Sequence, residues 1–66
     1  MDFLDLALNL IPIMKAIGTS LPDIIAFGRW AFDKVSQEGG PTSDDWKTLH
    51  AKEDEARAIL RARAPV

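Results

Sequence analysis

The chain has 66 residues, a net charge of −2 and a pI near 5.1, with 47% hydrophobic and 27% charged residues. A chain this short forms one domain, residues 1–66, and buries only about 60% of the surface that its unfolded form exposes. The sequence has no cysteine, which excludes disulfides and thiolate metal sites, and its acidity excludes a general attraction to nucleic acid or anionic lipid.

The first predicted helix covers residues 2–17, starting at Asp2 and ending before Gly18. Apolar residues occupy more than half of its circumference, which is typical of a helix that is buried from several directions. Pro12 lies on the narrow polar face and predicts a bend in this helix. Asp2 and Asp5 stand where a secretory signal carries basic residues, so a soluble, non-secreted protein is expected.

A membrane span is not expected in this segment. Residues 3–17 rise only about 22 Å as a helix, against about 30 Å for the hydrocarbon core. Polar residues also interrupt the run at Asp5, Asn9 and Lys15. Contact with the membrane surface stays open, although interfacial helices usually carry several basic residues where this one has only Lys15.

The second predicted helix covers residues 21–38 and follows a link short enough to make a helical hairpin. Ser20 and Asp23 have capping-box spacing, Pro22 suits the first turn, and Gly39-Gly40 ends the helix. Its apolar side carries Leu21, Ile24, Ile25, Phe27, Gly28, Ala31, Phe32 and Val35. Both other helices are expected to pack on this side, which makes the second helix the predicted organising element.

Two residues of the second helix have alternative interpretations. Trp30 falls among Asp23, Arg29, Asp33 and Lys34, so it is either a contact anchor for a partner or is covered by the third helix. Gly28 either lets another helix approach closely or is a tolerated loss of about 1 kcal/mol.

The third predicted helix covers residues 43–63. Thr42 is its predicted cap, with Asp45 three residues later. The apolar stripe comprises Trp46, Leu49, Ala56 and Leu60, with Glu53 in the middle and Ile59 to one side. The expected structural anchors are Ser20, Thr42, Trp46, Leu49 and Leu60.

The fold predicted from these segments is all-α: a three-helix mini-domain of a helical hairpin plus a C-terminal amphipathic helix. The apolar surface of the first helix exceeds what two short partners can cover, so completion by oligomerisation is expected. The predicted interface comprises Phe3, Leu6, Leu10, Ile13 and Ile17, together with Trp30.

Residues that could carry chemistry are few, and no enzymatic activity or cofactor is predicted. His50 is the only histidine, and His50 with Asp54 supplies two metal ligands at most, which do not make a site. No second histidine is present to activate a hydroxyl. A recognition helix beginning Asp44-Asp45 would aim carboxylates at phosphates, so nucleic-acid binding is not expected.

The segment GGPTSDDWKTLHAKEDEARAIL carries a recognisable pattern: Pro-Thr, two acidic residues, Trp, and Leu three residues after the Trp. The positions are Pro41, Thr42, Asp44, Asp45, Trp46 and Leu49. This third of the chain resembles the ends of short helical proteins of unknown role encoded in tailed-bacteriophage genomes. The resemblance implies a phage setting, in the virion or the host cytoplasm.

The expected function is therefore protein–protein interaction without catalysis. The resemblance favours a small phage-encoded structural component of a virion or tail, which oligomerises through its apolar first helix. Two alternatives stay open. One is a phage-encoded regulatory or inhibitory binder of a host protein, and the other is a membrane-surface helical protein that acts in lysis through residues 3–17.

Overall fold

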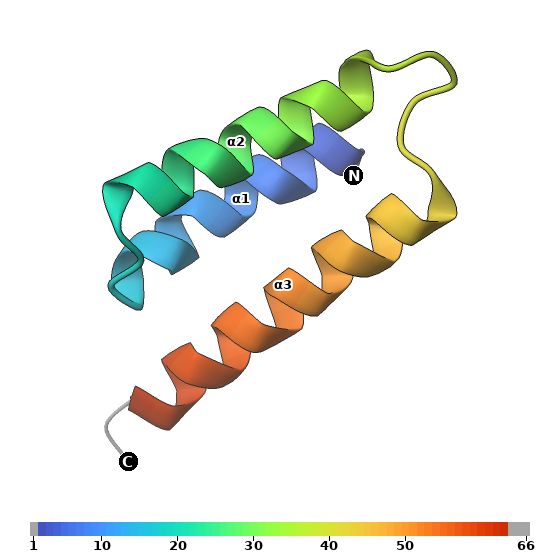
Figure 1. The fold of residues 1–66 in the computed structure, drawn as a ribbon. Coiled ribbons are helices and arrows are strands. Elements are labelled where there is room, and N and C mark those ends of the chain that lie inside the picture. Colours follow the sequence, from blue (N-terminus) through green and yellow to red (C-terminus); the bar gives the residue numbers. More distant parts are fainter. Residues whose placement is uncertain (1, 64–66) are drawn as a thin grey trace.

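The computed structural model describes residues 2–63, which form α1 (Phe3–Ala16), α2 (Leu21–Ser36) and α3 (Ser43–Arg63). Residues 2–63 contain no strand, so the predicted all-α, three-helix class is confirmed. Figure 1 shows α1 and α2 side by side in opposite directions, while α3 runs in the same sense as α1. The molecule is elongated, with extents of 45 × 22 × 17 Å.

The helix at the centre of this arrangement is α1. It packs against both α2 and α3, whereas α2 and α3 touch each other little. The prediction that the second helix organises the fold is therefore wrong. The physical reason lies in the wide apolar arc of α1, which presents one face to α2 and another to α3.

Local signals fix both ends of α1. The Asp2 carboxylate accepts a hydrogen bond from the Asp5 N–H at 2.8 Å, and the helix runs without a break through Pro12. At the other end Gly18 adopts φ +85°. Its N–H donates to the Lys15 carbonyl at 3.1 Å, and the Thr19 N–H donates to the Met14 carbonyl at 2.9 Å. These two bonds define a Schellman motif, which turns the chain into α2.

The two ends of α2 differ from the prediction. Ser20 occupies the N-cap position with an extended backbone, but its side chain makes no capping hydrogen bond. Pro22, the second helical residue, removes one of the two N–H groups that such a side chain reaches, which leaves less to cap. The helix ends at Ser36 because Gln37 is extended, two residues before the predicted end. The Gln37 side chain instead donates to the Gly40 carbonyl at 2.7 Å.

The core is one cluster drawn from all three helices. Its buried members are Phe3, Ala7, Leu10, Phe27, Ala31 and Leu49. The Phe3 ring is at its aromatic centre, with the Trp30 ring centroid 5.5 Å away and the Trp46 ring edge-on at 5.2 Å. Trp30 also stacks on Phe27 at 5.9 Å. Aromatic pairs at these separations add to the stability that burial alone provides.

Two glycines should respond in opposite ways to the same substitution. A Cβ at Gly28, inside α2, meets nothing within 4 Å, so Gly28→Ala should stabilise the domain by about 0.4–1 kcal/mol. Gly18→Ala should destabilise it by about 1–2 kcal/mol, since Gly18 has the left-handed backbone that disfavours a Cβ. Thermal unfolding of both variants at low micromolar concentration measures the two effects. Changes of the same sign would contradict this prediction.

Candidate interaction surface

Four large apolar side chains on the hairpin are exposed. Leu8 of α1 is 52% exposed, and on α2 the exposed fractions are 64% for Leu21, 48% for Ile25 and 61% for Phe32. We call these four residues the hairpin face. Isolated exposed leucines are ordinary on protein surfaces, but a group on adjacent helices is typical of an interaction site.

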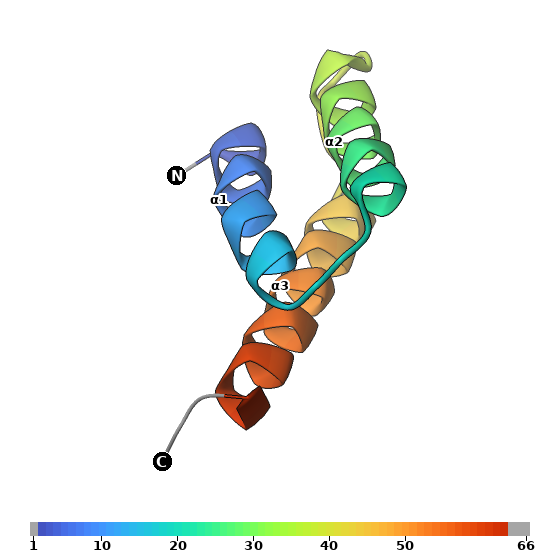
Figure 2. The same cartoon turned by 90° about the vertical axis from the view of Figure 1, so that its left-hand side faces the viewer.

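The hairpin face lies on the side of α1 and α2 away from α3. On α2, the Lys34 ammonium pairs with Asp45 of α3 at 3.6 Å, and Ile25 lies about half a turn around the helix from Lys34. On α1, Ile17 lines a groove against α3, and Leu8 lies about half a turn from Ile17. Figure 2 shows α3 along one side of the hairpin, with no other described segment on the opposite side.

The predicted interface residues mostly lie elsewhere. Phe3 and Leu10 are buried in the core of the single chain, so their assignment to an interface is wrong. Leu6, Ile13 and Ile17 are half-buried. The apolar excess of α1 is real, but α3 covers part of it, because α3 packs mainly on α1.

Trp30 is half-buried, and its ring contacts Phe3 of α1 and Phe27 of α2. Its cover in these contacts therefore comes from α1 and from its own helix, whereas the second of its two interpretations expected the third helix to cover it. The sequence does not predict the exposure of Leu21, Ile25 and Phe32, which belong to the expected packed side of the second helix. The signal for their exposure is the width of the apolar arc of α2, which spans about 160° around the helix.

Of the expected anchors on α3, those in its first half are buried or half-buried, and the one near its end is exposed. Leu49 is 0% exposed, Ala56 is buried and Trp46 is half-buried against the core, but Leu60 is 38% exposed. Near this end of α3, Ile59 instead lines the groove between α3 and α1. Arg63 fastens this end, because its Nη1 donates to the Ile17 carbonyl at 2.6 Å. A cation beside that carbonyl also suits the negative end of α1.

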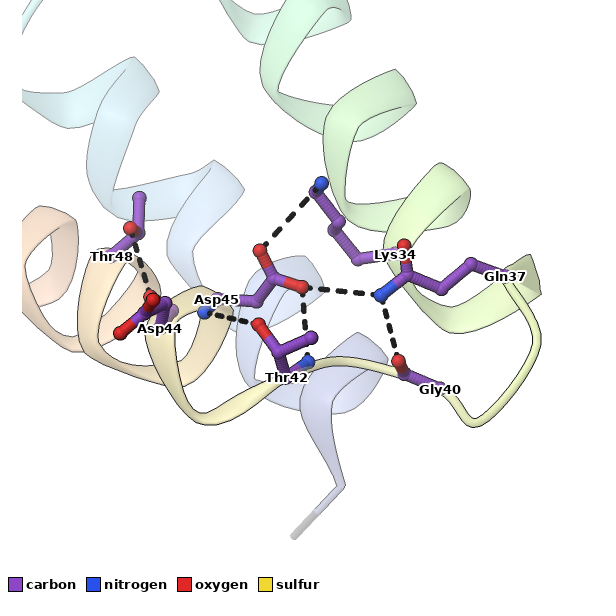
Figure 3. A network of polar contacts seen from close by, with 7 residues as sticks. All are labelled: Lys34, Gln37, Gly40, Thr42, Asp44, Asp45 and Thr48. Atoms are coloured by element: carbon purple, nitrogen blue, oxygen red, sulfur yellow. Dashed lines mark hydrogen bonds and ion pairs between the residues drawn. The ribbon is translucent and has the colours of Figure 1, made fainter.

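A polar network joins α2, the turn and the start of α3 (Figure 3). Thr42 and Asp45 make the reciprocal bonds of a capping box: the Thr42 N–H donates to Asp45 Oδ2 at 3.0 Å, and the Asp45 N–H donates to Thr42 Oγ1 at 3.2 Å. The Gln37 amide donates to the same Asp45 carboxylate at 3.2 Å, and Lys34 pairs with it. One carboxylate thus fixes where α3 begins relative to the end of α2.

Removing the Thr42 hydroxyl should weaken this junction. Thr42→Ala leaves the Asp45 N–H without its side-chain acceptor, which lowers the free energy of unfolding by about 1 kcal/mol. For a domain of this size, that corresponds to a drop in Tm of about 4–8 °C. Ser43→Ala, one residue along, is the matched control and should change Tm much less. Equal losses in the two variants would contradict the assignment of the cap.

The same carboxylate predicts an acid dependence. Hydrogen bonding from the Thr42 backbone N–H is the main cause that lowers the pKa of Asp45, helped by the Thr42 hydroxyl, Lys34 and Gln37 and opposed by desolvation. A lowered pKa in the folded state contributes stability that is complete above the unfolded pKa near 3.8 and is lost as the pH falls through the folded value.

Asp45→Asn should therefore lose stability relative to the original chain at pH 7, and the difference should narrow as the pH approaches 2. Urea unfolding of both proteins across this pH range measures the difference. The two proteins share all other carboxylates, so the difference in their free energies of unfolding reports Asp45 alone. A difference that stays constant with pH would contradict the prediction.

The residues considered for metal or ligand binding lie on α3 and in the groove between α1 and α3. Residues 2–63 contain no cluster of three or more histidine and acidic residues able to hold a metal. His50 stacks on Trp46 at 5.8 Å, and its Nδ1 lies 3.6 Å from Glu53, which also pairs with Arg57 at 3.3 Å. The groove between α1 and α3 has a volume of about 210 Å³. That is less than the roughly 300–1,000 Å³ of usual ligand pockets.

The fold and its exposed apolar residues together define a three-helix domain with one uncovered hairpin face. No protein-family model matches the chain, and searches of curated proteins and of solved structures return no match. No helix within residues 2–63 combines the length and apolarity needed to cross a membrane.

Proposed function

We propose that this chain is a non-enzymatic interaction and assembly protein that binds another polypeptide through the hairpin face. The resemblance of its last third favours a phage-encoded structural component of a virion or tail. The observation that carries the proposal is the group of four exposed apolar side chains on the side of the hairpin opposite α3.

The size of this surface supports the proposal. Taking about 200 Å² for a fully exposed large side chain, the four residues expose on the order of 450 Å². Partners in a standard interface each bury about 800 Å², of which about 56–58% is non-polar, which is again close to 450 Å². The hairpin face is therefore large enough to form the apolar centre of a protein interface.

The overall surface is consistent with a partner. The chain exposes 4648 Å², whereas a compact monomer of 7.3 kDa exposes about 4,200 Å². Its radius of gyration of 12.4 Å similarly exceeds the roughly 11 Å of a compact chain of 66 residues. The elongated shape leaves apolar area that a bound polypeptide would remove from water.

Photo-crosslinking in the cells that make the protein tests this proposal. Benzoylphenylalanine in place of Phe32 should yield adducts with a polypeptide. The same residue in place of Ala51, which is exposed on α3, is the control and should yield none. Mass spectrometry identifies the adducts. Lipid adducts at Phe32, or adducts of equal yield at both positions, would contradict the proposal.

A further inference from the structure

Within the hairpin face, α2 carries a regular seam. Leu21, Ile25, Gly28 and Phe32 follow one another at spacings of 4, 3 and 4, the a/d pattern by which two helices pack along a common stripe. We call these residues the α2 seam. Its three large side chains are exposed, and a Cβ at Gly28 meets nothing within 4 Å, so the described chain itself leaves the space beside Gly28 open.

We infer that the α2 seam binds the α2 seam of a second copy of this chain in the antiparallel direction. This inference rests on the proposed function, since it names the partner of the same face. In an antiparallel pair centred between residues 26 and 27, Leu21 faces Phe32 of the second copy, and Ile25 faces Gly28 of the second copy. At the centre of the pair, the Ile25 side chain of each copy then occupies the open space beside Gly28 of the other copy.

The parallel arrangement lacks this complementarity. There Phe32 meets Phe32 and Gly28 meets Gly28, which leaves a gap in the middle of the interface and loses contacts outright. Both arrangements have the two-fold symmetry that closes a dimer, because each copy offers the same patch, so the complementarity along the α2 seam decides between them.

The charges of α2 permit this pairing. Asp23, Arg29, Asp33 and Lys34 cancel, and the α2 seam itself has no charge, so two α2 helices do not repel each other although each chain is acidic. Leu8 of α1 lies on the same side of the hairpin and adds to the buried area. Two hairpins face to face form a four-helix core, with an α3 on the outer side of each.

Single cysteines test the pairing directly, because the natural chain has none. Leu21→Cys and Phe32→Cys proteins are prepared separately, then mixed and oxidised. The antiparallel pair brings residues 21 and 32 of different copies together, so the mixture should form a disulfide-linked heterodimer. Each variant alone should remain reduced, since its two cysteines would be about 16 Å apart along the helix axis, beyond the reach of a disulfide. Ala51→Cys mixed with either variant is the control.

Sedimentation equilibrium provides the second measurement. The original chain should dimerise, and a Leu21→Ser/Phe32→Ser double variant with unchanged circular dichroism should associate at least about tenfold more weakly. Phe32→Leu should retain most of the association. A disulfide in either single-cysteine variant alone would overturn the antiparallel pairing. A monomer up to about 100 µM would overturn self-association, and the proposed function would still stand if Phe32 crosslinks to a different polypeptide.

Discussion

Phe3→Ala should lower the free energy of unfolding by about 3–5 kcal/mol. Phe3 is only 2% exposed and contacts Trp30 from α2 and Trp46 from α3, so its ring joins the three helices. Stabilities of about 0.05–0.15 kcal/mol per residue give roughly 3–10 kcal/mol for the whole domain. The variant should therefore be largely unfolded at 37 °C if the domain lies near the lower end of that range.

Phe32→Ala is the matched control, because Phe32 is the same residue type at 61% exposure. Urea unfolding followed by circular dichroism, at concentrations low enough to keep the chain monomeric, should show a change within about 0.5 kcal/mol for Phe32→Ala. At higher concentration Phe32→Ala should begin to lose stability relative to the original chain, since association then contributes. Equal losses in both variants at low concentration would show that Phe3 is not at the centre of the core.

What the sequence predicts well here depends on neighbouring residues. The helix start at Asp2, the cap at Thr42 and the stop at Gly18 each involve groups within a few positions along the chain, so local spacing is enough to predict them. Helix class and approximate bounds follow from the same local signals. Local signals also have exceptions. The Ser20 side chain makes no capping hydrogen bond, and Pro22 in the first turn has no N–H for it to accept from.

The sequence does not predict which part of the apolar arc of a helix packs against another helix of the same chain. The arc of α2 is wider than α1 alone covers, and helical periodicity gives no reason to place α3 on the Trp30 side and not the Phe32 side. Placement of α3 depends on the six residues of the turn and on the Gln37, Lys34 and Asp45 contacts, which join residues up to eleven positions apart. The exposed hairpin face is the direct consequence of that placement.

The prediction for α3 concerns two leucines. Leu49→Ala should lower the free energy of unfolding by about 2–5 kcal/mol, since Leu49 is 0% exposed and belongs to the core cluster with Phe3 and Leu10. Leu60→Ala should change it by less than about 0.5 kcal/mol, because Leu60 is 38% exposed near the end of the helix. Periodicity alone places both leucines on one stripe and predicts similar losses.

Urea unfolding of both variants, followed by helical circular dichroism and by tryptophan fluorescence, distinguishes these outcomes. The fluorescence reports Trp30 of α2 and Trp46 of α3, which contact the same Phe3 ring. If Leu49 holds α3 on α1, both signals should change together at a lower urea concentration in Leu49→Ala. A loss in Leu60→Ala as large as in Leu49→Ala would mean that the end of α3 packs as the stripe predicts, with a partner covering Leu60 in solution.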